Sequence, residues 1–151
     1  MKKRAKPSKF VQQLARQIAR PHVEKEAVEV RGLIDGNLLL AKMCCETGNM
    51  SEKSLGGLIV PLRAVMTVAH DMGNEPLQRV ITGFEKPLRS MIDRFLAGNT
   101  AVSSSELATM SAVITAVLDA LPTLPDAQLV LAYNLSEAYR LKAAEQMWRA
   151  A

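Results

Sequence analysis

Long stretches of this chain repeat apolar residues at steps of three and four, which is the period of one buried face of an α-helix. The longest such run ends before Gly48, and no step in it departs from this spacing. Its seven positions predict a helix of about 25 residues. The run consists of Val23, Ala27, Val30, Ile34, Leu38, Ala41 and Cys45.

One dipeptide inside this run favours a different structure. Asp35-Gly36 lies between the apolar segments VEVRGLI and NLLLAKM, an arrangement that is typical of a two-residue β-hairpin turn. However, NLLLAKM does not alternate between apolar and polar residues, as a half-buried strand would. We therefore predict a helix here, with a single hairpin over Val28–Leu40 as the alternative.

Helix-start residues divide the chain into successive segments. Ser, Asn and Asp are favoured there because the side-chain oxygen accepts a hydrogen bond from a free backbone N–H of the first turn. Ser103 is followed three residues later by Glu106, which is the capping-box pattern. The residues predicted to begin helices are Ser8, Ser51, Asn74, Ser103 and Asp126.

Proline and glycine mark where the helices end or bend. Pro21 closes the first helix, and Gly73 and Gly98 are expected at the C-terminal ends of two later ones. A regular helix is expected to run from Pro61 to Met72, and Pro87 is expected to kink the helix that follows. The predicted fold is all-α, a compact bundle of five or six helices with a basic N-terminal arm.

Two segments are unusually apolar. The chain carries no charge from Leu107 to Leu118, so this segment, with Ile114 in its middle, is predicted to be the central and most buried helix. The first half of the last helix is apolar on nearly every side. Either that helix is buried centrally, or a second molecule covers its outer face, and we expect a homodimer or larger assembly. The candidate interface residues are Leu129, Val130, Leu131 and Tyr133.

Positive charge is concentrated at the N-terminus. Residues 1–21 contain seven basic residues and no acid, whereas the net charge of the whole 151-residue chain is +4. We therefore predict a basic arm with a short amphipathic helix over residues 1–21 and a single helical domain over 22–151. Such an arm indicates an anionic partner, and its cations neutralise phosphates if that partner is a nucleic acid. The candidate nucleic-acid-binding residues are Lys2, Lys3, Arg4, Lys6, Lys9, Arg16 and Arg20.

Targeting signals and cysteines bear on location. A secretory signal is disfavoured because polar residues interrupt the stretch after Lys9, although a mitochondrial transit peptide and a nuclear basic cluster both fit the N-terminus. No apolar run reaches the roughly 18–20 residues that span a bilayer. Cys44 and Cys45 are adjacent and cannot cross-link distant segments, so we interpret them as reduced thiols of a cytoplasmic protein.

The chain shows no recognisable catalytic pattern. It has two histidines, His22 and His70, so a metal site would also need carboxylates or the adjacent cysteines, which do not converge like zinc ligands. Gly56-Gly57 lacks the spacing and the lysine of a phosphate-binding loop. We predict no catalytic residue, no metal, no cofactor and no small-molecule substrate.

Three classes of function remain. We expect a non-enzymatic helical protein-interaction module that associates with itself or with another protein. The first alternative is a nucleic-acid-associated accessory or regulatory protein that contacts phosphates through its basic N-terminus. The second alternative is an enzyme without a recognisable motif.

Overall fold

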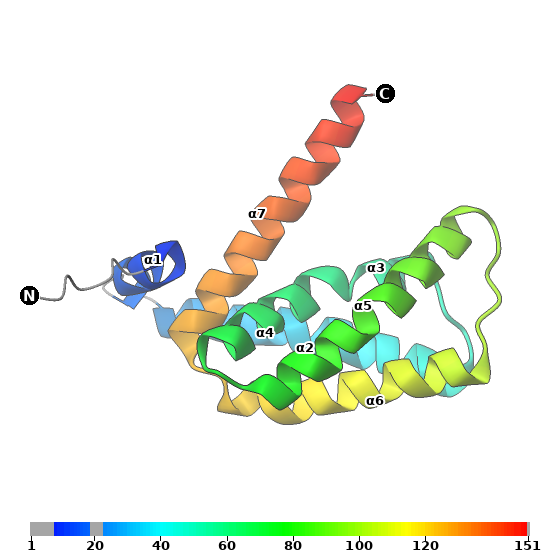
Figure 1. Cartoon of the computed structure of the whole chain (residues 1–151), viewed down its shortest axis with the longest axis horizontal. Helices are drawn as coiled ribbons and strands as arrows, with labels where there is room; N and C mark the ends of the chain where they lie inside the picture. Colours follow the sequence, from blue (N-terminus) through cyan, green and yellow to red (C-terminus); the bar gives the residue numbers. More distant parts are fainter. Residues whose placement is uncertain (1–7, 19–22, 151) are drawn as a thin grey trace, which may run out of the picture.

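The computed structural model describes residues 8–18 and 23–150 of the chain. These residues form helices and contain no strand, so the predicted all-α bundle is confirmed (Figure 1). Residues 1–7 of the predicted basic arm lie outside the described part. The helices are α1 (Lys9–Ile18), α2 (Val23–Thr47), α3 (Glu52–Gly56), α4 (Ile59–Asp71), α5 (Glu75–Leu96), α6 (Ser104–Ala120) and α7 (Asp126–Ala150), with a 3-10 turn, η1, over Leu121–Thr123.

The long apolar run forms one continuous helix, α2, of 25 residues. Its helical period is confirmed, and the alternative hairpin over Val28–Leu40 is wrong. One face of the helix is buried along its length, and Asp35 and Gly36 lie exposed on the other side. The five buried positions outweigh the turn preference of one dipeptide, because each buried Val, Ile or Leu side chain contributes about 1.5–3 kcal/mol. The buried residues are Ala27, Val30, Ile34, Leu38 and Ala41.

Four of the five predicted helix-start residues cap their helices, and the fifth, Asp126, is the first residue of α7. The Ser8 side chain accepts a hydrogen bond from the Val11 N–H, and the Asn74 side chain accepts one from the Leu77 N–H. Ser103 begins a capping box, and Ser51 begins another at the short helix α3. A helix follows α3, but it starts at Ile59 and not at the expected Pro61. Proline fits this first turn because the N–H that it lacks has no partner within the helix there.

The prediction that the charge-free segment is the most buried helix is wrong. This segment forms α6, which buries one face against α2 and α5 and exposes Ala108, Ala112 and Thr115 on the other. Alanine, serine and threonine carry no charge yet tolerate solvent, so an uncharged sequence does not require a buried helix. The most buried helix is α4, which packs against α7, α5 and α2. Its buried residues are Val60, Pro61, Leu62, Ala64, Val65, Val68 and Ala69.

The two halves of α7 have different surroundings. The first half packs against α4 and α2, whereas the second half extends away from the bundle (Figure 1). Leu129, Val130 and Leu131 are buried in the chain's own core, and Tyr133 is partly buried against it. Burial within one chain therefore accounts for most of the apolar residues in this half of α7, although Leu135 stays exposed.

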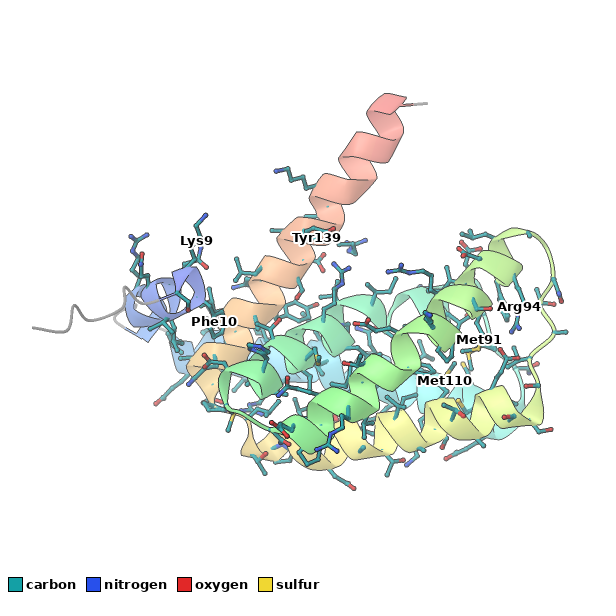
Figure 2. The ribbon with its side chains drawn as sticks, viewed as in Figure 1. Lys9, Phe10, Met91, Arg94, Met110 and Tyr139 are labelled. Carbon is teal, nitrogen blue, oxygen red and sulfur yellow. The ribbon has the colours of Figure 1, made fainter. Side chains whose placement is uncertain are left out.

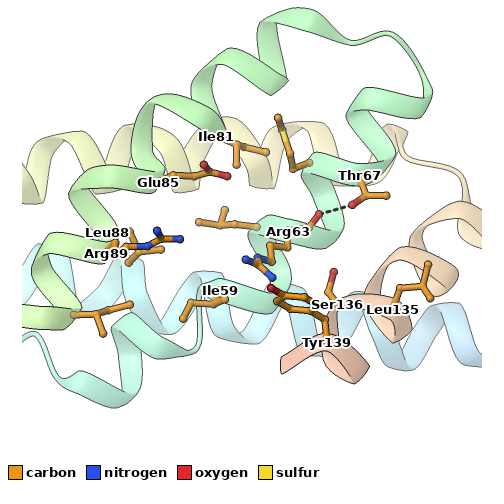
Figure 3. A pocket seen from close by; sticks show the side chains of 13 residues that line it. Ile59, Arg63, Thr67, Ile81, Glu85, Leu88, Arg89, Leu135, Ser136 and Tyr139 are labelled. Atoms are coloured by element: carbon orange, nitrogen blue, oxygen red, sulfur yellow. Dashed lines mark hydrogen bonds between the residues drawn. The ribbon is translucent and has the colours of Figure 1, made fainter. Parts of the chain in front are cut away.

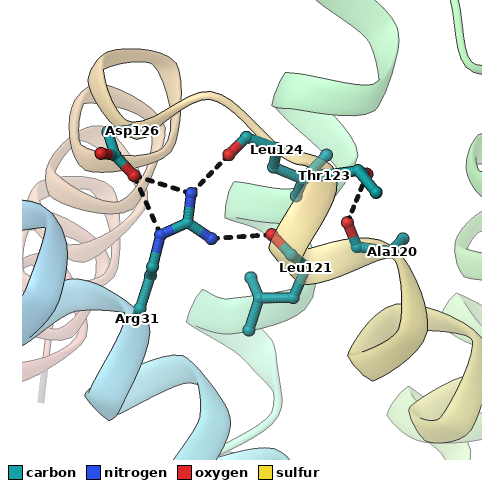
Figure 4. Close-up of polar contacts among 6 residues, drawn as sticks. All are labelled: Arg31, Ala120, Leu121, Thr123, Leu124 and Asp126. Atoms are coloured by element: carbon teal, nitrogen blue, oxygen red, sulfur yellow. Dashed lines mark hydrogen bonds and ion pairs between the residues drawn. The ribbon is translucent and has the colours of Figure 1, made fainter.

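Arg31 of α2 fixes the position at which α7 begins (Figure 4). Its guanidinium donates hydrogen bonds to the backbone oxygens of Leu121, at 2.7 Å, and of Leu124. It also donates to the Asp126 carboxylate, at 3.0 and 2.8 Å. One side chain thus joins α2, the turn after α6 and the first residue of α7.

A second ion pair joins the end of α5 to the start of α6. Arg94 donates to Glu106 at 2.6 Å, and Glu106 also accepts a hydrogen bond from the Ser103 backbone N–H. The Ser103 N–H, and after it Arg94, holds the pKa of the Glu106 carboxyl below its usual value, because both favour the charged form. This contact fixes the end of the bundle farthest from the first half of α7 (Figure 2).

Candidate protein-binding groove

An open groove of about 570 Å³ lies where α7 diverges from the bundle (Figure 3). Its floor is α4, which packs against both α5 and α7, and these two helices form its walls. The floor and walls are mainly apolar, with polar side chains interspersed. The apolar lining residues are Ile59, Leu62, Met66, Ile81, Leu88, Ile92 and Leu135, and the polar ones are Arg63, Thr67, Glu85, Arg89, Ser136 and Tyr139.

Each helix contributes a row of residues at helical spacing. On α5 the row is Ile81, Glu85, Leu88 and Ile92, at steps of four, three and four. Residues at these spacings share one face of a helix, so the same face that packs in the core continues to the groove. Leu88 and Ile81 are buried, whereas Ile92 is only partly covered. Part of the apolar surface of Ile92 is therefore open to the groove.

Two arginines from different helices line the groove. The Arg63 guanidinium lies over the Tyr139 ring, 4.6 Å from its centroid, in a cation–π contact that joins α4 to α7. Arg89 lies one turn after Glu85 on α5. Among the described residues, neither arginine forms an ion pair. The groove thus combines an apolar floor with cations that have no carboxylate partner there.

The predicted interface residues do not line this groove. Leu129, Val130 and Leu131 are buried in the core, so α7 offers its accessible apolar surface further along, at Leu135 and Tyr139. Tyr139 lies on the part of α7 that leaves the bundle (Figure 2). Neither residue was among the predicted interface residues, although Leu135 ends the apolar run and Tyr139 follows it by four residues, which places both on one face of the helix.

Two of the predicted nucleic-acid-binding residues are described. Lys9 and Arg16 lie two turns apart on α1, and both are exposed. Phe10 of the same helix packs against the core, and α1 contacts α7. The structure therefore attaches this basic helix to the bundle. The remaining candidates, Lys2, Lys3, Arg4, Lys6 and Arg20, lie outside the described residues.

A second apolar surface covers the outer side of α2. Val28 is 73% exposed and Met43 is 61% exposed. Gly32 and Gly36 lie between them, and a side chain built on either glycine would meet nothing within 4 Å. Each glycine costs about 1 kcal/mol of helix stability relative to alanine, and no packing within the described chain uses the space. Self-association stays a prediction, and this face is its best candidate. Its other exposed residues are Leu33, Leu39 and Leu40.

Two further features concern metal binding and membranes. Within the described ranges, no group of His, Cys, Asp and Glu side chains could hold a metal ion, and both cysteines are free thiols. The prediction that no apolar run is long enough to span a bilayer is wrong by length and composition alone, because the segment Ser104–Thr123 is long and apolar enough to cross a membrane on that measure. The segment includes α6, whose inner face supplies core residues such as Ile114, and 28% of its apolar window is buried within the bundle.

Comparison of the chain with protein-family models, curated proteins and solved structures found no match.

Proposed function

We propose that this protein is a helical protein-interaction module that binds a helix of a partner protein in the groove between α4, α5 and α7. The observation that carries the proposal is the open apolar groove itself. Grooves between helices commonly take up the apolar face of an amphipathic helix. Exposed apolar surface with a polar surround is also typical of protein-binding sites.

The groove lies where the bundle lacks a packing neighbour. The first half of α7 covers α4, but the second half turns away from it (Figure 1). Ile59, Met66 and Ile92 are consequently only partly buried beside the groove. A partner helix in this position would complete their burial and remove apolar surface from water.

A designed helical peptide tests the groove directly. The probe carries leucines at positions i, i+4 and i+7 and glutamines elsewhere on its flanks, and a fluorescent label reports binding by anisotropy. We expect the full chain to bind this peptide. Leu135→Glu should weaken binding at least tenfold, about 1.4 kcal/mol, because it places a charge in the apolar lining of the groove.

The matched control is Leu96→Glu. Leu96 is exposed and lies on α5, but it does not line the groove. This variant should bind the peptide like the unmodified chain. If the peptide does not bind, or if both variants weaken binding equally, the groove is not a helix-binding site.

The alternative function, nucleic-acid binding through the N-terminus, is favoured by the charge distribution. Seven basic residues and no acid occupy residues 1–21, and Lys9 and Arg16 are exposed on α1. Phosphate contacts of this kind depend strongly on salt and carry no information about base sequence.

Replacement of Arg16 and Arg20 by glutamine tests this alternative. An arm that makes four to six phosphate contacts should give a slope of log affinity against log salt near −4 to −5 for duplex DNA. The double variant should lower the magnitude of that slope by roughly two, because each contact contributes about 0.9. A fluorescence titration at several salt concentrations measures it. Absence of binding at about 50 mM salt would exclude the alternative.

A further inference from the structure

The chemistry of the groove also indicates what kind of helix it takes. Given the proposed function, we infer that the groove selects an amphipathic helix that carries acidic residues beside its apolar stripe. Carboxylates of that helix would pair with Arg63 and Arg89, while its apolar side chains cover the floor formed by α4.

The first argument is a contrast between arginines. The structure gives four of the described arginines a carboxylate partner within 4.0 Å, whereas the two that line the groove, and Arg16 on α1, have none among the described residues. Glu85 lies one turn before Arg89, an arrangement that favours an ion pair on a helix, yet the two do not form one. The paired arginines are Arg31, Arg79, Arg94 and Arg140.

The second argument is the way in which Arg63 is held. Its guanidinium lies over the Tyr139 ring. This contact restricts the Arg63 side chain before a partner binds, so less rotamer freedom is lost on binding. The N–H groups of a guanidinium point outward in its own plane, so an arginine that lies over a ring face can still donate them to a carboxylate. Arginine pairs with carboxylates through two parallel hydrogen bonds, which gives direction as well as attraction.

The shape of the groove favours a helix over a small amphipathic anion. A small ligand is usually enclosed over most of its surface, whereas this groove is an open cleft with a floor and two helical walls. Glu85 lies one turn before Arg89 on α5 and also lines the groove. Its negative charge repels the carboxylates of a partner, so the two ends of the α5 wall differ in charge. The acidic residues of the partner should therefore lie toward the Arg89 end.

Three peptides with one apolar stripe and different flanks test the inference. The flanking residues are glutamate, glutamine or lysine, and anisotropy gives the dissociation constant of each for the full chain. We expect the glutamate peptide to bind about fivefold more tightly than the glutamine peptide, and the lysine peptide to bind most weakly. Added salt should reduce this preference, since partly exposed ion pairs are screened.

Arginine variants locate the preference. Arg63→Gln and Arg89→Gln should each reduce it, and Arg89→Glu should favour the lysine peptide. Arg79→Gln is the matched control, because Arg79 lies on the same helix but does not line the groove. Arg79→Gln should leave the preference unchanged, and circular dichroism should show that all four variants keep their helix content.

The possible outcomes separate this inference from the proposed function. If all three peptides bind equally, the charge selection is wrong, while the groove remains a helix-binding site. If Arg79→Gln removes the preference as strongly as Arg89→Gln, general surface charge causes it and the inference fails. If no peptide binds but dodecanoate does, the groove takes a small amphipathic anion, and both the inference and the proposed function are wrong.

Discussion

Ile114→Asp is expected to unfold the protein or to leave it insoluble. Ile114 is fully buried on the face of α6 that packs against α2 and α5. Burial of a polar group without a partner costs roughly 2–7 kcal/mol, and more if the group is charged. That cost is comparable to the whole stability of a domain, about 5–15 kcal/mol. The soluble fraction after expression and the thermal melt of any soluble protein measure the effect.

Thr115→Asp is the control for this variant. Thr115 is the next residue of α6, and it lies on the exposed face. An aspartate there should change stability by no more than about 0.5 kcal/mol, as surface substitutions usually do. An unchanged melting temperature for Ile114→Asp would contradict the packing of α6, and an equal loss in both variants would show that helix propensity, not burial, causes it.

The sequence predicts the helices well because their signals are local. The period of α2 and the cap at Ser103 each depend on residues within a few turns of one another. Burial is harder to predict, as α4 and α6 show. The most buried helix, α4, contains Arg63 and His70 at exposed positions, whereas α6 has no charge over Leu107–Leu118 and still exposes one face.

The groove could not be predicted because it depends on how helices far apart in the sequence pack together. Arg63 and Tyr139 meet only because the first half of α7 lies along α4. The sequence marks the departure of α7 from the bundle only by a change of composition, from apolar residues to charged ones such as Glu137, Arg140 and Lys142. The sequence allows two explanations for the apolar residues on every side of Leu129–Leu135: a helix inside the bundle, or a surface covered by a second molecule. In the structure most of these residues face the chain's own core.

The contact that sets the position of α7 should therefore affect both stability and the groove. Arg31 satisfies the backbone oxygens of Leu121 and Leu124, two buried residues, together with the Asp126 carboxylate. Hydrogen bonds to charged groups contribute about 1.5–3 kcal/mol each, and an unpaired buried acceptor costs about 1–3 kcal/mol. Because these contributions are not additive, we expect Arg31→Ala to lower the free energy of unfolding by about 3 kcal/mol.

Two further variants show whether the planar guanidinium, and not its charge, carries this effect. Arg31→Lys keeps the charge but cannot reach two carbonyls and a carboxylate at once, so it should recover less than half of the loss. Arg79→Ala is the matched control, since its pair with Glu75 is exposed and should contribute no more than about 0.5 kcal/mol. Urea unfolding measures all three variants. If Arg31→Ala unfolds at the same midpoint as Arg79→Ala, the hydrogen bonds around Arg31 do not hold α7.

If these hydrogen bonds do hold α7, Arg31→Ala should weaken peptide binding in the groove as well as stability, because α7 forms one wall of the groove.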